Sequence, residues 1–95
     1  MNDPNLLVMA SLAAGDKHGY AIMADIQRFA GVRLGPGTLY GAITRLEERG
    51  WIRPGRRSSR RQPYSLTAEG RAELQARISA LEQVVRAGQR RLRVS

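Results

Sequence analysis

Cysteine is absent from the 95 residues, and histidine and lysine occur once each, as His18 and Lys17. Without cysteine the chain forms neither a disulfide nor a thiolate zinc site, and a single histidine cannot hold a metal ion. No apolar run approaches the roughly 18 residues of a membrane span, and the first residues are acidic, unlike a secretory signal. We therefore expect a cytoplasmic protein without metal, cofactor or membrane contact.

Catalytic constellations are also missing from the sequence. It contains no Ser/His/Asp set and no pair of carboxylates in a pocket-forming context. The run Gly35-Pro36-Gly37-Thr38 lacks both the spacing and the lysine of a Walker phosphate loop. We therefore expect no enzyme and assign no catalytic residue.

Positive charge is abundant. Sixteen Lys and Arg residues against eight Asp and Glu residues give a net charge of +8, and all but one of the sixteen are Arg. Arginine is always charged and its planar fork matches phosphate oxygens, which favours a phosphate-rich partner. A genome that prefers arginine codons would produce the same excess. A chain of this length fits one domain with a marginal core, which a second chain would complete.

Residues 35–50 form the segment around which the chain is organised. Pro36 and Gly50 bracket a run in which Leu39, Ile43 and Leu46 recur three and four apart, as on one face of a helix. The other side carries groups that donate hydrogen bonds or positive charge: Thr38, Tyr40, Thr44 and Arg45. This pattern predicts a recognition helix in a DNA major groove. Its strongest candidate for a guanine or phosphate contact is Arg45, although a solvated arginine is equally consistent with the pattern.

A basic loop follows this segment. Residues 51–53 and 64–66 read as short strands, and residues 54–63 between them contain four arginines and no acid: Arg56, Arg57, Arg60 and Arg61. Two strands joined by such a loop predict a wing that reaches the DNA backbone or the minor groove. A charged run is usually only a solvated surface, but its position beside a recognition helix favours contact with DNA.

Two further helices are predicted before the recognition helix. Asp3 and Pro4 read as the cap and first residue of a helix. This helix is apolar on more than one face, so we expect a partner chain to cover the second apolar face and place Leu6 and Met9 in a dimer interface. The alternative is a helix buried on all sides within one chain. Residues 16–19 read as a turn, and helical spacing from Tyr20 to Gly31 predicts the first helix of a helix-turn-helix.

The last helix is predicted from residue 68, with Thr67 as its cap. Its apolar residues recur at intervals of four, three, four and seven: Leu74, Ile78, Leu81, Val85 and Leu92. This short coiled-coil pattern predicts a homodimer through the last helix. We therefore expect residues 1–66 to form a DNA-binding domain and residues 67–95 a dimerisation helix, together one compact unit.

Three motifs in order resemble the PadR family of transcriptional regulators, in particular its short subfamily. They are His18-Gly19-Tyr20, the run Pro36-Gly37-Thr38-Leu39-Tyr40 continued by Gly50-Trp51-Ile52, and Tyr64-Ser65-Leu66-Thr67-Ala68-Glu69-Gly70. The resemblance implies a mainly α winged helix-turn-helix with a small β-hairpin wing and a long C-terminal dimerisation helix. It also implies contact of Tyr20 with DNA phosphate, with His18, Pro36 and Gly37 at the same interface. A local hydrogen-bonding role for His18 and a solvated hydroxyl for Tyr20 are the alternatives.

The function implied by the resemblance is a transcriptional repressor that binds a pseudo-palindromic operator in double-stranded DNA as a homodimer, associated with the nucleoid when bound. Family members often respond to an aromatic effector between the two chains. Here the last helix has no aromatic residue, so an effector, if one exists, would use the aliphatic surface around Met9, Leu81 and Val85. The alternative function is a dimeric basic module that binds a protein partner, RNA or DNA without sequence preference.

Overall fold

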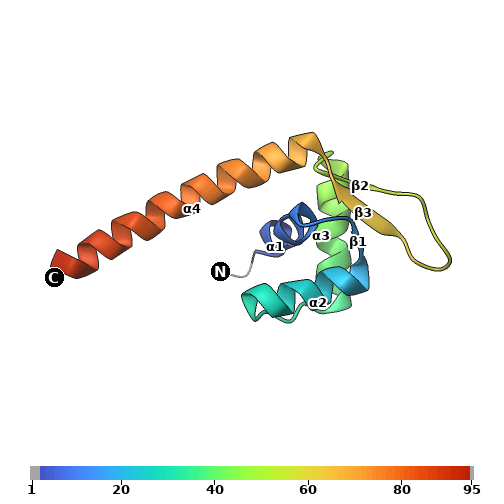
Figure 1. Cartoon of the computed structure of the whole chain (residues 1–95), viewed down its shortest axis with the longest axis horizontal. Coiled ribbons are helices and arrows are strands. Elements are labelled where there is room, and N and C mark those ends of the chain that lie inside the picture. Colours follow the sequence, from blue (N-terminus) through green and yellow to red (C-terminus); the bar gives the residue numbers. More distant parts are fainter. Residues whose placement is uncertain (1–2, 95) are drawn as a thin grey trace.

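The computed structural model describes residues 3–94. Within them lie four helices, α1 (Pro4–Ala13), α2 (Gly19–Ala30), α3 (Pro36–Glu48) and α4 (Ala68–Val94), and three strands, β1 (Lys17–His18), β2 (Ile52–Pro54) and β3 (Pro63–Leu66) (Figure 1). The strands form one antiparallel sheet in the order β1-β3-β2. Helices α2 and α3 form the helix-turn-helix, and β2 and β3 form the wing. The mainly α winged helix predicted from the sequence is therefore confirmed.

The helix boundaries follow from local capping groups. Asp3 accepts a hydrogen bond from the backbone N–H of Asn5, and Pro4 is the first residue of α1. Helix α2 ends at Gly31, whose φ of 67° is a left-handed conformation that glycine adopts without strain. Helix α3 starts at Pro36. The hydroxyl of Thr67 accepts a bond from the N–H of Gly70 and so caps α4.

The turn predicted at residues 16–19 was an incomplete description, because Lys17 and His18 form a strand. Lys17 pairs with Tyr64 and His18 pairs with Pro63, so β1 extends the wing sheet on its other side. A strand of two residues is too short to show an alternating pattern, and only its partner in space defines it. The consequence is that the start of α2 is attached directly to the base of the wing.

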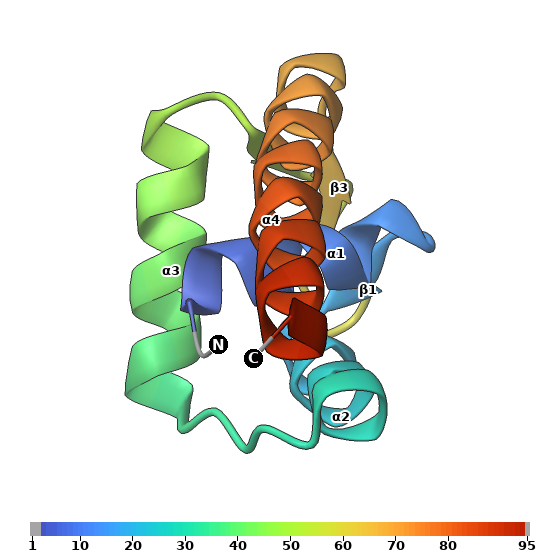
Figure 2. The same cartoon turned by 90° about the vertical axis from the view of Figure 1, so that its left-hand side faces the viewer.

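Helix α1 lies at the centre of the fold, between α3 and α4 (Figures 1 and 2). Met9 is fully buried there, and Leu74 from the first turns of α4 is 5% exposed. The prediction of these two residues as dimer contacts was wrong, because both fill the core of their own protomer. Helical spacing indicated that both residues pack against an apolar surface. It did not indicate whether that surface belongs to the same protomer or to a partner. Leu6 is only partly buried against the same core.

Helix α4 is attached to the body at its base and projects from it. The molecule measures 56 × 26 × 20 Å, and the far end of α4 lies on the opposite side of the body from the wing loop (Figure 1). At the base, the N–H of Thr67 donates to the carbonyl of Trp51 at 3.0 Å, and the hydroxyl of Thr67 donates to the carbonyl of Gly50 at 2.6 Å. Gly70 packs directly against the Trp51 carbonyl.

The indole of Trp51 reinforces this joint. The guanidinium of Arg49, which follows α3, lies 5.1 Å from the ring centroid, and that of Arg77, from α4, lies 5.3 Å from it. Both distances are within the range of cation–π attraction. Arg77 also bonds Glu73 at 2.8 Å. Trp51 therefore connects the end of α3 to the base of α4, and its predicted anchoring role agrees with its partial burial against the core.

A polar network joins α1, β1 and α2. The buried hydroxyl of Ser11 donates to Asp25 at 2.7 Å, and the Nζ of Lys17 donates to the carbonyl of Ser11 at 2.6 Å. Arg28 bonds the other carboxylate oxygen of Asp25 at 3.2 Å. The hydrogen bond from Ser11, followed by the charges of Lys17 and Arg28, holds the pKa of Asp25 below its usual range despite some opposing desolvation.

We predict that Asp25→Asn lowers the free energy of unfolding by about 1 kcal/mol at pH 7, the usual contribution of one such hydrogen bond. Because folding lowers the pKa of Asp25, its contribution is present at neutral pH and is lost as the pH falls below about 4. Urea titrations should therefore show a deficit for the variant at pH 7 that shrinks at pH 3. Asp16→Asn, at an exposed position, is the control; a deficit that does not change with pH would contradict the prediction.

Candidate nucleic-acid interface

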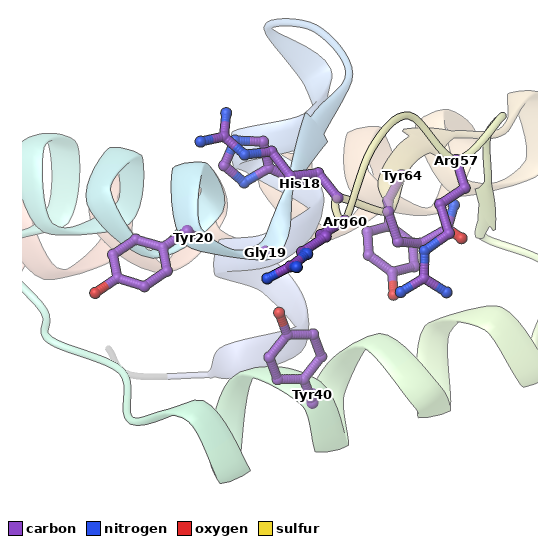
Figure 3. A pocket seen from close by; sticks show the side chains of 9 residues that line it. His18, Gly19, Tyr20, Tyr40, Arg57, Arg60 and Tyr64 are labelled. Atoms are coloured by element: carbon purple, nitrogen blue, oxygen red, sulfur yellow. The ribbon is translucent and has the colours of Figure 1, made fainter.

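An open cleft of about 640 Å³ lies where the start of α2, the first turns of α3 and the wing meet (Figure 3). Its walls combine aromatic rings with cationic groups, and the lining residues are His18, Gly19, Tyr20, Tyr40, Arg57, Arg60, Arg61, Gln62 and Tyr64. The cleft thus unites sequence segments that are up to 46 positions apart. It brings together six of the predicted DNA contacts: His18, Tyr20, Tyr40, Arg57, Arg60 and Arg61.

Gly19 and Tyr40 form the contact between the two helices of the helix-turn-helix. The hydroxyl of Tyr40 points toward Gly19, where any Cβ atom would collide with the phenol (Figure 3). Gly19 is therefore required by close approach, a role that the sequence analysis missed because the partner lies 21 positions away. Tyr40 remains about half exposed, so one edge of its ring still faces the cleft. Its packing fixes the angle between α2 and α3.

Tyr64 forms the floor of the cleft. Its side chain is 8% exposed, and burial, together with the nearby Glu47 carboxylate, raises the pKa of its hydroxyl above the usual range. The hydroxyl therefore stays neutral and remains a hydrogen-bond donor at physiological pH. The sequence analysis did not place Tyr64 at the interface, because its strand pattern indicated only a residue that alternates between the two faces of the sheet.

The N-terminus of α3 has no side-chain cap. Its N-cap residue is Gly35, which offers no hydrogen-bond acceptor, and Pro36 has no N–H. The exposed N–H groups of the first turn, at Gly37 and Thr38, are thus directed out of the helix along its dipole. Such an end binds phosphate oxygens.

The wing loop between β2 and β3 carries Arg56, Arg57, Arg60 and Arg61, which we call the wing arginines. All four are exposed, and none forms an ion pair within residues 3–94. The amide of Gln62 donates to the carbonyls of Gly55 at 2.8 Å and Pro63 at 3.0 Å, which closes the base of the loop. The loop therefore presents four positive charges that the described residues leave unneutralised.

Thr44 and Arg45 are already engaged within the chain. The hydroxyl of Thr44 donates to the carbonyl of Tyr40 at 2.9 Å, and Arg45 donates to the side chain of Asn5 at 3.2 Å. Arg45 thus leans toward α1 rather than across the face it shares with Thr44. Both side chains are exposed, and each keeps hydrogen-bonding capacity beyond this bond, since the Thr44 hydroxyl can still accept and the Arg45 guanidinium has further N–H donors.

His18 and Tyr20 differ in their surroundings. Nδ1 of His18 accepts a bond from the N–H of Ala21 at 3.4 Å, so the ring caps α2, which agrees with the local role left open by the sequence. Tyr20 is 77% exposed and its hydroxyl points away from the body of the protein. His18 therefore positions the start of α2, whereas Tyr20 is free to contact a ligand.

The apolar stripe on α4 becomes more exposed toward the far end of the helix. Ile78 is 38% exposed, Val85 54% and Leu92 78%, and Leu81 lies between Ile78 and Val85 on the same side. A groove of about 310 Å³ runs beside them and is lined by Ile78, Leu81, Glu82, Val85, Arg86 and Gln89. This surface is uncovered in the single chain.

Other kinds of site find no support in the described part of the chain. No three His, Asp or Glu side chains in residues 3–94 come close enough to hold a metal ion. None of the described helices combines the length and the hydropathy that a membrane crossing requires.

Comparison with known families accounts for this arrangement. The model of the transcriptional regulator PadR-like family matches residues 8–76, which is well over half of the chain. The protein belongs to the PadR family. It is therefore a transcriptional regulator with a winged-helix DNA-binding fold, and, as expected from the missing catalytic groups, the family consists of regulators rather than enzymes.

Solved structures share the fold of this chain, and a curated protein is similar to it in sequence. A transcriptional regulator from Clostridium thermocellum is 26% identical, with a TM-score of 0.81 over 92% of this chain and 87% of that one. A PadR family regulator from hypervirulent Clostridium difficile is 23% identical, with a TM-score of 0.84 over 94% and 97% of the two chains. An uncharacterized 37.1 kDa protein in transposon TN4556 of Streptomyces fradiae is 49% identical over 74 residues, which are 78% of this chain. The chain spans only 21% of the length of that relative.

Proposed function

We propose that the protein binds double-stranded DNA as a homodimer at a pseudo-palindromic operator and represses transcription from it. The observation that carries the proposal is the cleft that the exposed phenols of Tyr20 and Tyr40 line together with unneutralised wing arginines. The uncapped N-terminus of α3 begins one turn before Tyr40. Each of these groups can stabilise a phosphate oxygen. Because they lie on α2, α3 and the wing, together they could contact successive phosphates along one DNA strand. A dimer bound at a promoter would exclude the polymerase.

The proposed contacts divide into two classes. Phosphates are bound by the Tyr20 hydroxyl, by the N–H groups of Gly37 and Thr38, and by the wing arginines, which also reach the minor groove. Base edges in the major groove are read by Thr38, Thr44 and Arg45 along the exposed side of α3. Tyr40 supports both classes because it fixes α3 against α2.

The proposed dimer covers the apolar stripe of α4 with the α4 of a second copy. The part of α4 up to residue 82 carries three acids, Glu69, Glu73 and Glu82, against Arg71 and Arg77, whereas the distal part carries four arginines and no acid. These four, Arg86, Arg90, Arg91 and Arg93, are called the tail arginines below. A parallel pair would place both sets of tail arginines together, but an antiparallel pair separates the two sets and brings each toward a part of the partner helix with nearly balanced charge. Charge therefore favours the antiparallel arrangement.

We predict that Leu81→Asp produces monomers, because it places a charge in the middle of the apolar stripe. Sedimentation velocity should show half the wild-type mass at the same protein concentration, and DNA affinity should fall with it. Gln83→Asp, at an exposed position on the opposite side of the helix, is the matched control and should remain dimeric. A Leu81→Asp protein that remains dimeric would place the interface elsewhere.

An effector, where one exists, would bind between the chains beside the groove lined by Leu81 and Val85. Met9, which the sequence also assigned to this surface, does not take part in it because it is fully buried in the core. The groove walls are aliphatic and include Glu82 and Arg86, which suits a small ligand with both apolar and charged groups.

Binding to the DNA upstream of its own gene, compared with random DNA of equal length at two salt concentrations, tests the proposed function. A sequence-specific regulator should prefer one fragment by about a thousandfold or more. Equal affinities that collapse as salt rises would instead indicate an architectural DNA binder. No binding to either fragment would favour a protein or RNA partner for the basic surface.

A further inference from the structure

The tip of the wing contains two adjacent serines between two pairs of arginines, in the run Arg56-Arg57-Ser58-Ser59-Arg60-Arg61. Both serines are exposed. The backbone N–H and carbonyl groups of Ser58 and Arg61 bond each other at 3.2 and 3.0 Å, and Ser59 sits at the apex of this turn with a φ of 59°. Figure 1 shows the loop extending well beyond the body of the molecule. The turn is thus held by few bonds and is open on all sides.

These two hydroxyls differ from those of five other serine and threonine residues in the described part of the chain. Ser11 is buried and bonded to Asp25, and Thr44 and Thr67 donate to backbone carbonyls. Ser65 is fixed in a paired strand, and Ser79 lies inside α4. Within residues 3–94, the hydroxyls of Ser58 and Ser59 make no hydrogen bond. They combine exposure, a position in a turn at the tip of a loop, and a strongly basic flank.

We propose that Ser59 is a phosphorylation site that switches off DNA binding. Arg56 and Arg57 precede Ser59 by three and two residues, and the acidic substrate groove of a basophilic protein kinase recognises this charge pattern. In the reaction, the Ser59 Oγ forms a bond to the γ-phosphorus of a nucleoside triphosphate supplied by the kinase. The bond from that phosphorus to the bridging oxygen breaks, the nucleoside diphosphate leaves, and the serine proton passes to the kinase base and then to solvent.

A phosphate on Ser59 would have cationic side chains of the same loop close to it. Ser58, Ser59, Arg61, Pro63 and His18 line a hollow of about 440 Å³ on the wing, so a phosphate on Ser59 would lie beside the Arg61 guanidinium. A phosphoserine carries nearly two negative charges and forms strong bonds to arginine. It therefore engages wing arginines within the chain and repels the DNA backbone. This regulatory step rests on the proposed function.

Labelling identifies the acceptor. The full chain is incubated with radiolabelled ATP and the catalytic subunit of cyclic-AMP-dependent protein kinase, which selects serines preceded by arginines three and two positions earlier. Trypsin would cut on both sides of the serines, so chymotrypsin is used to release residues 52–64 for mass spectrometry. Ser59→Ala should lose the label, whereas Ser79→Ala, an exposed serine on α4, should keep it. Labelling that persists in Ser58→Ala/Ser59→Ala, or no labelling at all, overturns the proposal.

DNA binding of the purified phosphoprotein tests the switch. If the phosphate cancels two arginine contacts, the slope of log K against log salt should flatten by about 1.8, and affinity at about 0.15 M salt should fall roughly 30-fold. Phosphatase treatment should restore both. An affinity equal to that of the unmodified protein overturns the switch. If the unmodified protein fails to bind any DNA, the proposed function and the switch both fail, whereas the assignment of Ser59 is judged on the labelling alone.

Discussion

Replacing the four wing arginines together with alanine is expected to weaken DNA binding about a thousandfold at about 0.15 M salt. Each exposed guanidinium is free of an ion pair in the described part of the chain and is positioned to neutralise one phosphate. Each lost contact should flatten the slope of log K against log salt by about 0.9, so the four together remove about 3.6. Fluorescence anisotropy with operator and random DNA at four or five salt concentrations measures both quantities.

The matched control removes the same number of charges elsewhere. Replacing the four tail arginines with alanine lowers the net charge equally but at the far end of α4, on the opposite side of the body from the wing (Figure 1). At a protein concentration at which sedimentation shows both variants to be dimeric, it should change the salt slope much less than the wing substitution does. Equal losses in the two variants would show that net charge, rather than the position of the wing, determines affinity. An unchanged slope in the wing variant would remove the wing from the mechanism.

Gly70→Ala is expected to have the largest effect on stability. A Cβ at this position would overlap the carbonyl oxygen of Trp51 and press on Leu66, and a backbone carbonyl cannot rotate away as a flexible side chain can. We expect the free energy of unfolding to fall by about 3 kcal/mol, the upper range of overpacking costs. The corresponding decrease in Tm is roughly 12–24 °C for a domain of this size. Thermal unfolding followed by circular dichroism gives the value.

Gly88 on the same helix supplies the control, since no atom lies within 4 Å of a Cβ built there. Gly88→Ala should stabilise α4 by about 0.5–1 kcal/mol, because alanine has the higher helix propensity. Both proteins must be compared at one concentration, since dimerisation makes Tm depend on it. Equal losses of stability in the two variants would contradict the proposed role of the contact between Gly70 and Trp51.

The parts of the fold that were predictable from sequence depend on local chemistry. Asp3, Gly31, Pro36 and Thr67 set helix ends through bonds or dihedral angles within a few residues of themselves, so each boundary can be read along the chain. The wing was also predictable, because turn residues and a basic run separate its two strands. The strands were placed within one residue of their observed ends.

The features that escaped prediction depend on partners distant in sequence. Strand β1 exists only because β3 lies beside it, and Gly19 is constrained only by the phenol of Tyr40. Met9 and Leu74 show the same limit for packing: helical spacing identified them as apolar contacts, but the choice between core and dimer interface depends on how the helices pack. The candidate site residues were predicted from motifs and remain a prediction, whereas the hydrogen bonds of His18, Thr44 and Arg45 became visible only in the structure.

Because α4 is long and is attached to the DNA-binding body only at its base near Trp51, a small rotation at that joint produces a large displacement at the far end of the helix. The helix has 27 residues and, at a rise of about 1.5 Å each, spans about 40 Å. A rotation of about 10° at the joint displaces its far end by roughly 7 Å over that length. In the proposed dimer, the partner's α4 would fix α4 in place. The same rotation at the joint would then move the DNA-binding body, so that α3 and the wing shift together across the DNA. In the proposed complex, half-sites one helical turn apart would be spaced about 34–36 Å, and a shift of this size would break the match. In the proposed dimer, the stiffness of the contacts between the Trp51 indole and the guanidinium groups of Arg49 and Arg77 would therefore set how much variation in operator spacing the protein tolerates.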